Sequence, residues 1–209
     1  MSSTPQILFE NDLFLVVNKP AGWLSVPARE PKPTDLVLSH WARDRSSSRE
    51  AWVVHRLDRF TSGIILFAKS EGSQKTGNTW FEERIVKKVY QFLAAPPPSR
   101  PAIQIKTPVD GKSSQTLFEV IQKTDTVFFG RATPLTGRFH QIREHAKDGG
   151  FPILGDASCK GLRTVSTKGE TLTVPRVCLH AFSLETPVGK FEAPLADDIK
   201  TLWEKISHD

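Results

Sequence analysis

The sequence predicts an α+β fold in which a mixed, mostly antiparallel sheet carries flanking helices and loops. Short apolar or alternating runs rich in Val, Ile, Phe and Thr recur between Gly, Pro, Asp or Ser residues, as is typical of β-strands. Helical patterns are fewer and lie scattered among them. The expected strands span residues 7–10, 13–18, 63–69, 86–94, 116–122, 126–133 and 178–186.

Three segments favour helices. Thr34 and Asp35 are typical N-cap residues ahead of an apolar pair. Residues 140–147 are polar and favour helix, and the two glycines that follow are a natural stop. A helical stripe of apolar residues covers 195–206 and predicts an amphipathic C-terminal helix. Trp80, Phe81 and Ile85 indicate a further helix, which Gly72 and Gly77 weaken.

Two segments break the strand pattern. Residues 43–50 (RDRSSSRE) are polar and serine-rich, which predicts an exposed loop. Residues 95–101 (APPPSRP) fit neither helix nor central strand, because proline lacks a donor and its ring blocks a helix. We expect this stretch to be a stiff connector between two halves of one domain. Without repeats or a sharp boundary, the prediction is a single domain over 1–209, with its core about 7–206.

Composition is that of a globular protein. Of 209 residues, 38% are hydrophobic and 24% charged, which argues against wholesale disorder. Lys and Arg total 28 against 23 Asp and Glu, and the net charge of +5 permits an anionic partner. The N-terminus lacks a secretory pattern, and the apolar runs are too short for a bilayer. Cys159 and Cys178 form no CxxC pair, so we expect a soluble, reduced, cytoplasmic protein.

The densest polar cluster lies at residues 55–63 (HRLDRFTSG). Asp58 stands between Arg56 and Arg59. A carboxylate near cations stays ionised and oriented, which suits a nucleophile or a residue that organises an anion site. The alternative is a solvated Arg–Asp pair at a turn before a strand. Residue types alone leave both interpretations open.

A second cluster lies at residues 136–143 (TGRFHQIR). Its glycine permits close approach of a ligand, and both Arg138 and Arg143 suit phosphate or carboxylate groups. The alternative is a capped helix whose basic residues face water. In a third segment, strand alternation points Lys88 and Tyr90 to one face, and a tyrosine beside a lysine can accept a proton. Such a tyrosine more often simply packs with its hydroxyl at the surface.

Other chemistries find little support. Residues 72–79 imitate a phosphate-binding loop, but Asn78 replaces its lysine. His140 and His145 are five apart rather than four, and no cysteine spacing forms a zinc site. A Ser-His-Asp arrangement stays open, without a G-x-S-x-G elbow to support it.

The clusters together resemble the RluA-type family of pseudouridine synthases. HRLDRFTSG matches the family's HRLDxxTSG, TGRFHQIR matches TGRxHQ(I/L)R, and KVY at residues 88–90 matches KxY. NKPAG at 18–22, PILGD at 152–156 and CLHAFSLETP at 178–187 also fit family signatures in the right order. The resemblance covers nearly the whole chain.

This resemblance implies the family's catalytic fold and the isomerisation of selected uridines in ribosomal RNA, transfer RNA or both, without metal or organic cofactor. It implies that Asp58 is the nucleophile, that Tyr90 packs on the target base and that Arg143 pairs with the catalytic carboxylate. It assigns Arg56 to displacement of the target base from its stack. The first chemical step, attack on the anomeric carbon or glycal formation, stays open.

The resemblance also implies a set of RNA-binding residues and a monomeric protein that does not bind membranes. The residues expected to bind RNA are Arg56, His55, Arg59, Arg138, His140 and Gln141. Three departures concern RNA contacts: Ser25 and Phe151 replace common histidines, and Cys159 stands near a usual tyrosine. With little chain before the motifs, we expect recognition by the catalytic domain alone, through loops such as 43–50.

Two other classes of protein remain as alternatives. A non-catalytic RNA-binding relative predicts loss of Asp58, Tyr90 or Arg143, and all three are present. A metal-dependent phosphodiesterase needs a carboxylate or histidine cluster that the sequence does not show.

Overall fold

The computed structural model describes residues 4–208, and the chain divides into two compact units. The first unit comprises the chain up to Lys87 together with Ala181–Pro194. The second comprises Lys88–His180 and the chain from Leu195 onward. The chain passes between the units three times, after Lys87, His180 and Pro194. The expectation of a single domain stays a prediction.

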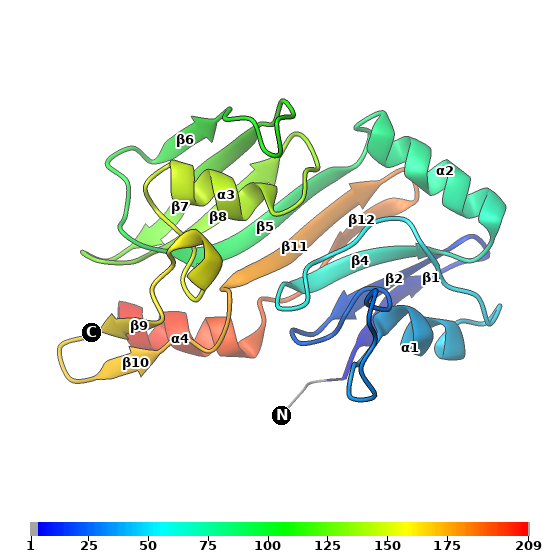
Figure 1. Ribbon diagram of the computed structural model, residues 1–209, viewed down its shortest axis with the longest axis horizontal. Coiled ribbons are helices and arrows are strands. Elements are labelled where there is room, and N and C mark those ends of the chain that lie inside the picture. Colours follow the sequence, from blue (N-terminus) through cyan, green and yellow to red (C-terminus); the bar gives the residue numbers. More distant parts are fainter. Residues whose placement is uncertain (1–3, 209) are drawn as a thin grey trace. The chain divides into compact units, whose positions relative to one another are not determined.

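The first unit is built on a sheet in the order β1-β2-β4-β11 (Figure 1). The short strand β3 pairs with β4, and β12 pairs with β11. Every pairing among β1, β2, β3 and β4, and that of β11 with β12, is antiparallel. The bounds are β1 (Gln6–Glu10), β2 (Phe14–Lys19), β3 (Trp52–Val53), β4 (Ser62–Ala68), β11 (Leu179–Thr186) and β12 (Gly189–Glu192).

Strand alternation places one helix on each face of this sheet. Phe14 and Val16 of β2 share an apolar cluster with Trp80 and Phe81 of helix α2 (Glu71–Glu82). The intervening residues of β2 instead pack with Leu38 and its neighbours on α1 (Leu38–Arg45). Both faces are therefore apolar, which explains the near-continuous hydrophobic runs of β2 and β4.

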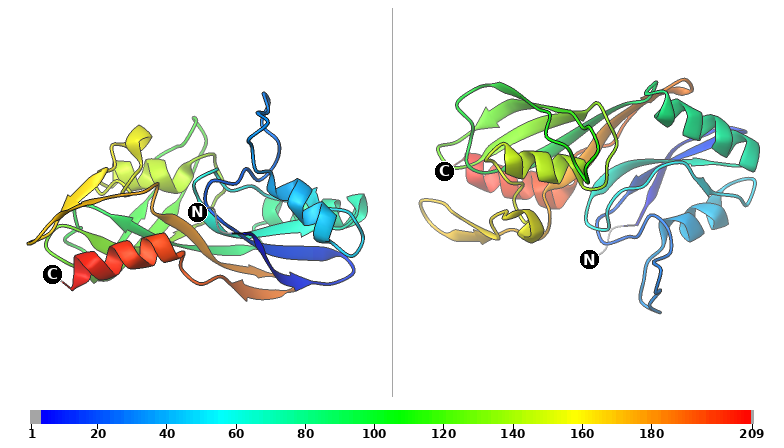
Figure 2. Two further views of the ribbon diagram at one scale, coloured as in Figure 1. Left: turned by 90° about the horizontal axis from the view of Figure 1, so that it is seen from below. Right: turned by 45° about the horizontal axis from the view of Figure 1, so that its top comes forward.

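The second unit has its own antiparallel strands in the order β5-β8-β7-β6. Helices α3 and α4 lie on opposite faces of these strands (Figure 2). Four phenylalanines in edge-to-face contact, Phe92, Phe118, Phe128 and Phe151, form the centre of its core. The bounds are β5 (Lys87–Ala94), β6 (Ala102–Ile105), β7 (Thr116–Lys123), β8 (Phe128–Pro134), α3 (Gln141–Asp148), the 3-10 helix η1 (Ala157–Cys159), the hairpin β9 (Thr164–Ser166) and β10 (Thr171–Thr173), and α4 (Asp197–Ser207).

The mixed, mostly antiparallel α+β fold is confirmed, and all seven expected strands are present within two residues at each end. Five strands of two to four residues each were not predicted from the sequence: β3, β6, β9, β10 and β12. Strands this short carry too little alternation to stand out, and partner strands elsewhere in the chain decide them.

The helix predictions need three corrections. The N-cap of α1 is Val37, without a side-chain cap, and not Thr34 or Asp35. Residues 43–45, expected in a loop, form the last turn of α1. Helix α2 is a full helix despite its two glycines, because Ser70 and Ser73 form a reciprocal capping box. The packing favours glycine at residue 77, because a Cβ there would lie only 3.0 Å from both Val54 methyl groups. The phosphate-loop imitation at 72–79 is thus helical.

The proline-rich stretch also differs from its prediction. Residues 95–101 connect β5 to β6 inside the second unit and do not join the two units. The chain leaves β5 through a cis Ala95–Pro96 peptide bond. The stretch belongs to the second unit because Ala95 is buried in its core.

Candidate active site

Asp58 lies on the aspartate loop, residues 54–61, which joins β3 to β4 in the first unit. The side chain is half-buried, and the Thr61 amide donates a hydrogen bond of 3.1 Å to the Asp58 carbonyl, closing a turn. Arg56 and Arg59 on either side are exposed. The loop thus presents one carboxylate between two cations.

A buried lysine fixes the path of the aspartate loop. Lys19, at the end of β2, is fully buried. Its ammonium donates to the carbonyls of Pro20 at 3.1 Å, Trp23 at 2.8 Å and Arg59 at 3.0 Å. The Gly22 amide donates to the same Arg59 carbonyl at 2.8 Å. The NKPAG segment therefore holds the backbone carbonyl of Arg59, the residue directly after Asp58.

Ser25 fastens the peptide directly before Asp58. Its hydroxyl donates to the Leu57 carbonyl at 2.8 Å and accepts from the Leu57 amide at 3.0 Å. At the position where the family often has histidine, serine thus clamps both backbone groups of one residue. The sequence does not predict this role, because Ser25 and Leu57 are 32 residues apart in the chain.

Two predicted RNA-binding residues of this loop also make internal contacts. The Arg59 guanidinium donates to the Gly22 carbonyl at 3.1 Å and pairs with Asp35 at 3.2 Å. The His55 ring accepts a hydrogen bond of 3.0 Å from the Leu66 amide and stacks on Phe81. Both residues therefore help to shape the loop, a contribution that the sequence pattern does not reveal.

The glycine that ends the HRLDRFTSG motif has a steric role. Gly63, in β4, has φ +109°, a conformation that L side chains rarely adopt. A Cβ at this position would lie 2.2 Å from the Ala181 carbonyl oxygen. Only glycine allows the neighbouring backbone to approach so closely behind the aspartate loop.

In the second unit, Lys88 and Tyr90 lie on β5 and are both half-buried. Tyr90 pairs with Ala132 on β8, which leads into the Gly137 turn, residues 135–140. A Cβ on Gly137 would lie 3.4 Å from the Lys88 ammonium, so the KVY and TGR motifs meet here. Burial lowers the pKa of Lys88.

Gln141 holds the Gly137 turn from inside. Its side-chain oxygen accepts from the Thr136 hydroxyl at 2.6 Å and the Arg138 amide at 3.0 Å. Its side-chain nitrogen donates to the Gln115 carbonyl and the Thr116 hydroxyl, both at 3.0 Å. With these four bonds and 3% exposure, the side chain serves as an internal brace.

Arg143, on α3, is held by a buried carboxylate. Its Nε donates to Asp156 Oδ2 at 2.6 Å and its Nη2 to Asp156 Oδ1 at 2.7 Å, a bidentate pair. Nη2 also donates to the Ser158 hydroxyl. Burial alone would raise the pKa of Asp156, but the hydrogen bonds from Arg143 and Ser158 outweigh it and lower that pKa. Asp156 is a functional candidate that the sequence analysis missed, although it ends the PILGD segment.

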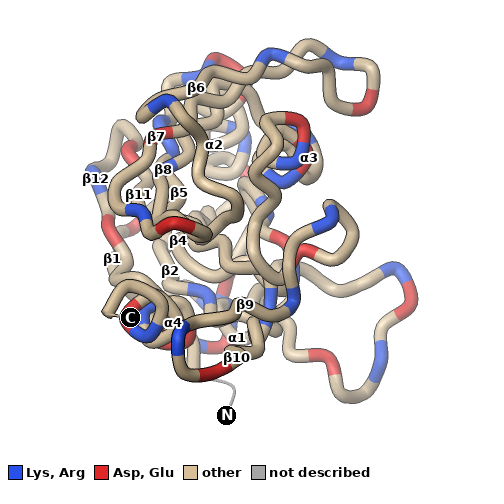
Figure 3. Tube along the Cα trace, turned by 90° about the vertical axis from the view of Figure 1, so that its left-hand side faces the viewer, with Lys and Arg blue, Asp and Glu red and all other residues tan. Residues whose placement is uncertain are grey.

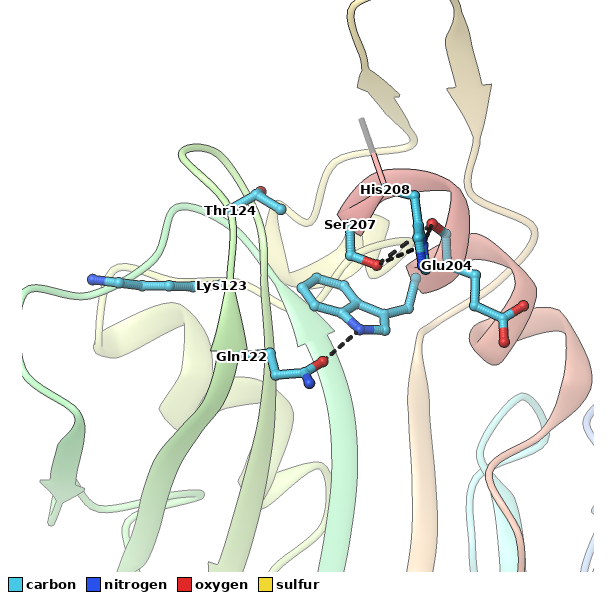
Figure 4. Close-up of a pocket in the computed structure, with 7 residues that line it drawn as sticks. Gln122, Lys123, Thr124, Glu204, Ser207 and His208 are labelled. Carbon is cyan, nitrogen blue, oxygen red and sulfur yellow. Dashed lines mark hydrogen bonds between the residues drawn. The ribbon is translucent and has the colours of Figure 1, made fainter.

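Within residues 4–208, no three His, Cys, Asp or Glu side chains gather as a metal site, and no helix is long and apolar enough to cross a membrane. Basic and acidic positions are interspersed along the chain (Figure 3). A hollow of about 540 Å³ lies beside α4, where Trp203 donates to Gln122 at 3.0 Å (Figure 4). None of the predicted site residues lines it.

Comparison with known proteins decides the family. Residues 13–148 match the family model described as RNA pseudouridylate synthase. The protein of Vibrio vulnificus named dual-specificity RNA pseudouridine synthase RluA is 38% identical, with 72% of this chain and 67% of that protein covered. The chain belongs to the RluA-type family of RNA pseudouridine synthases.

Further comparisons agree with membership of the RluA-type family. An Escherichia coli protein of the same name is 34% identical, with 84% of this chain and 83% of that protein covered. The solved structure of human RNA pseudouridylate synthase domain containing 4 shares the fold, with a TM-score of 0.76 and 20% identity over 96% of this chain and 92% of that one. As an RluA-type synthase the protein is an isomerase that acts on RNA.

Proposed function

We propose that this RluA-type synthase converts uridines of ribosomal RNA, transfer RNA or both to pseudouridine, with Asp58 as its nucleophile. The observation that carries the proposal is the aspartate loop, whose backbone on both sides of Asp58 is fixed by Lys19 and Ser25. A half-buried carboxylate on a fixed backbone is preorganised for reaction with a ribose. The relatives named dual-specificity RNA pseudouridine synthases favour more than one kind of RNA target.

The remaining residues take the roles that the resemblance implies. Tyr90 packs on the target base, and Arg143 pairs with the catalytic carboxylate, its guanidinium held by Asp156. Arg56 is exposed and displaces the target base from its stack, without which the glycosidic bond is inaccessible. Catalysis detaches the base from ribose C1′, rotates it and joins its C5 to C1′. The C5 proton then leaves to water and N1, freed from C1′, takes up a proton, so the product is an isomer of uridine and no oxidant is needed.

RNA binding is assigned in two groups. Arg56, Arg59, Arg138 and His140 contact the RNA, whose phosphates attract basic side chains. His55 and Gln141 act by holding the aspartate loop and the Gly137 turn, as their hydrogen bonds to the protein favour. The proposal also includes a cytoplasmic monomer that needs no metal or organic cofactor. Unchanged turnover in excess chelator and a single sedimenting species of one chain's mass are the results it expects.

The test is tritium release from RNA labelled at C5 of uridine. Transfer RNA and ribosomal RNA come from cells that lack this protein, and Asp58→Asn is the matched control because its shape is nearly unchanged. We expect release by the wild type alone, with RNA binding retained in the variant, since an amide is a poor nucleophile. Appreciable turnover by Asp58→Asn would exclude Asp58 as nucleophile. No release by the wild type from either RNA would reject the substrate proposal.

A further inference from the structure

The Gly137 turn exposes an aromatic side chain that the mechanism leaves unused. Phe139 is 64% exposed, the largest exposed fraction among the large hydrophobic residues of the described chain. Most aromatic side chains of the second unit pack into its core instead. A solvent-exposed phenylalanine within the TGRFHQIR motif therefore calls for an explanation.

The ring of Phe139 is held in a defined position. It stacks on the His140 ring with centroids 3.7 Å apart and an interplanar angle of 23°. His140 has φ +55° and ψ +15°, a left-handed conformation that is unfavourable for a non-glycine residue. Gln141 and its four hydrogen bonds fix the backbone on either side. The turn thus presents one face of an aromatic pair to solvent at a conformational cost.

Two basic residues belong to the segments next to this ring. Arg138 precedes it, and the Arg138 guanidinium lies against the Ser113 carbonyl at 3.4–3.5 Å. The exposed Lys112 adjoins Ser113, and Asp110 is the acidic residue of the same segment. An aromatic face with cations beside it fits a nucleobase with its phosphates, whereas an apolar protein partner gains little from the cations.

We propose that Phe139, backed by His140, is a stacking platform for an unpaired base that neighbours the target uridine. The proposal rests on the proposed function, because it takes RNA as the substrate. The platform is close to the KVY motif, since the Gly137 turn adjoins the Lys88 ammonium. Stacking tolerates any base, so this contact contributes affinity and positioning, while other contacts select the sequence.

The test measures binding without turnover, using a short single-stranded oligouridylate that carries one 2-aminopurine. Phe139→Ala and Phe139→Leu should raise Kd about 5-fold or more and abolish the quenching of 2-aminopurine fluorescence that stacking causes. Phe139→Trp should keep Kd within about 2-fold, because it keeps an aromatic face. Leu162→Ala is the matched control, since Leu162 is 50% exposed in the same unit, and its Kd should not change.

Three results would overturn the platform. Phe139→Leu binding and quenching like the wild type would show that no aromatic face is needed. An equal loss in Leu162→Ala would show a general surface effect. An unchanged Kd in Phe139→Ala, together with loss of self-association in sedimentation, would make Phe139 a protein contact. Failure of the wild type to release tritium would reject the proposed function. The binding measurements would still show whether Phe139 stacks on a base, because they do not depend on turnover.

Discussion

The aspartate loop of the first unit and the Arg143 region of the second hold charged side chains in different ways. Lys19 is a buried cation whose ammonium donates hydrogen bonds to three main-chain carbonyls. Arg143 is a buried cation with a full carboxylate partner, Asp156. The first arrangement fixes the path of the backbone, and the second fixes the orientation of a side chain.

This difference follows from where each residue lies. Asp58 is on a loop, where backbone peptides have no ladder partners and must be held from outside. Arg143 is on α3, whose backbone is already fixed by its own hydrogen bonds, so only the side chain needs a partner. We therefore expect steric changes to damage the first region most and charge changes to damage the second.

The largest expected effect separates two motif glycines. Gly63→Ala should cost more than about 4 kcal/mol of unfolding free energy, since its Cβ would lie 2.2 Å from the Ala181 carbonyl at φ +109°. Gly137→Ala should cost far less, because its nearest neighbour is the flexible end of Lys88 at 3.4 Å. Urea unfolding of both variants checks the contrast. Equal losses would contradict a steric distinction between the two motifs.

Next comes the ion pair of the second unit. Asp156→Ala should cost about 3 kcal/mol or more, because it removes both bidentate hydrogen bonds from a buried guanidinium. Asp156→Asn should cost less, since the amide oxygen still accepts one hydrogen bond. Tritium release should fall in both. Glu204→Gln, in a solvent-exposed pair with Lys200 in the same unit, is the control and should change stability little. A stable, fully active Asp156→Ala would show that Arg143 needs no positioning.

The Lys19 site should be less sensitive to loss of charge than the Arg143–Asp156 pair. Lys19→Met removes three donated hydrogen bonds but also removes a buried cation, so we expect a net loss of about 2 kcal/mol. Amide hydrogen exchange should quicken at Gly22 and Thr61, the amides that hold the turn. Lys75→Met, which breaks an exposed pair, is the control. Unchanged exchange at those amides would mean that Lys19 does not hold the aspartate loop.

The smallest effect concerns pH in the first unit. Hydrogen bonds from Lys69 and Ser47 lower the pKa of Glu10 from 4.5 to about 2. The stabilisation is therefore fully present above pH 4.5 and is lost as pH falls toward 2. Glu10→Gln should lower stability by about 1 kcal/mol at pH 7 and flatten this acid dependence. Unfolding curves across that range check it, and parallel slopes for both proteins would contradict the pKa shift.

Local patterns allowed much of the fold to be predicted, but they failed where partners are distant. The long strands and α3 follow from alternation and from the glycines after Asp148, which act within a few residues. The two-residue β3 exists only because β4 offers it a ladder. Helix α2 was only weakly predicted, because its two glycines have low helix propensity. In the structure, its capping serines and the packing of Gly77 beside Val54 outweigh that propensity.

The sequence by itself determined the family motifs, and with them Asp58, Tyr90 and Arg143 as candidates for one reaction on RNA. Those motifs are short, contiguous strings, so reading them needs no folded chain. Only the tertiary structure decided what holds those residues: Ser25 at Leu57, Lys19 at Arg59 and Asp156 at Arg143. These partners stand 13 to 40 residues apart in the chain, and hydrogen bonds of about 3 Å between them exist only after folding.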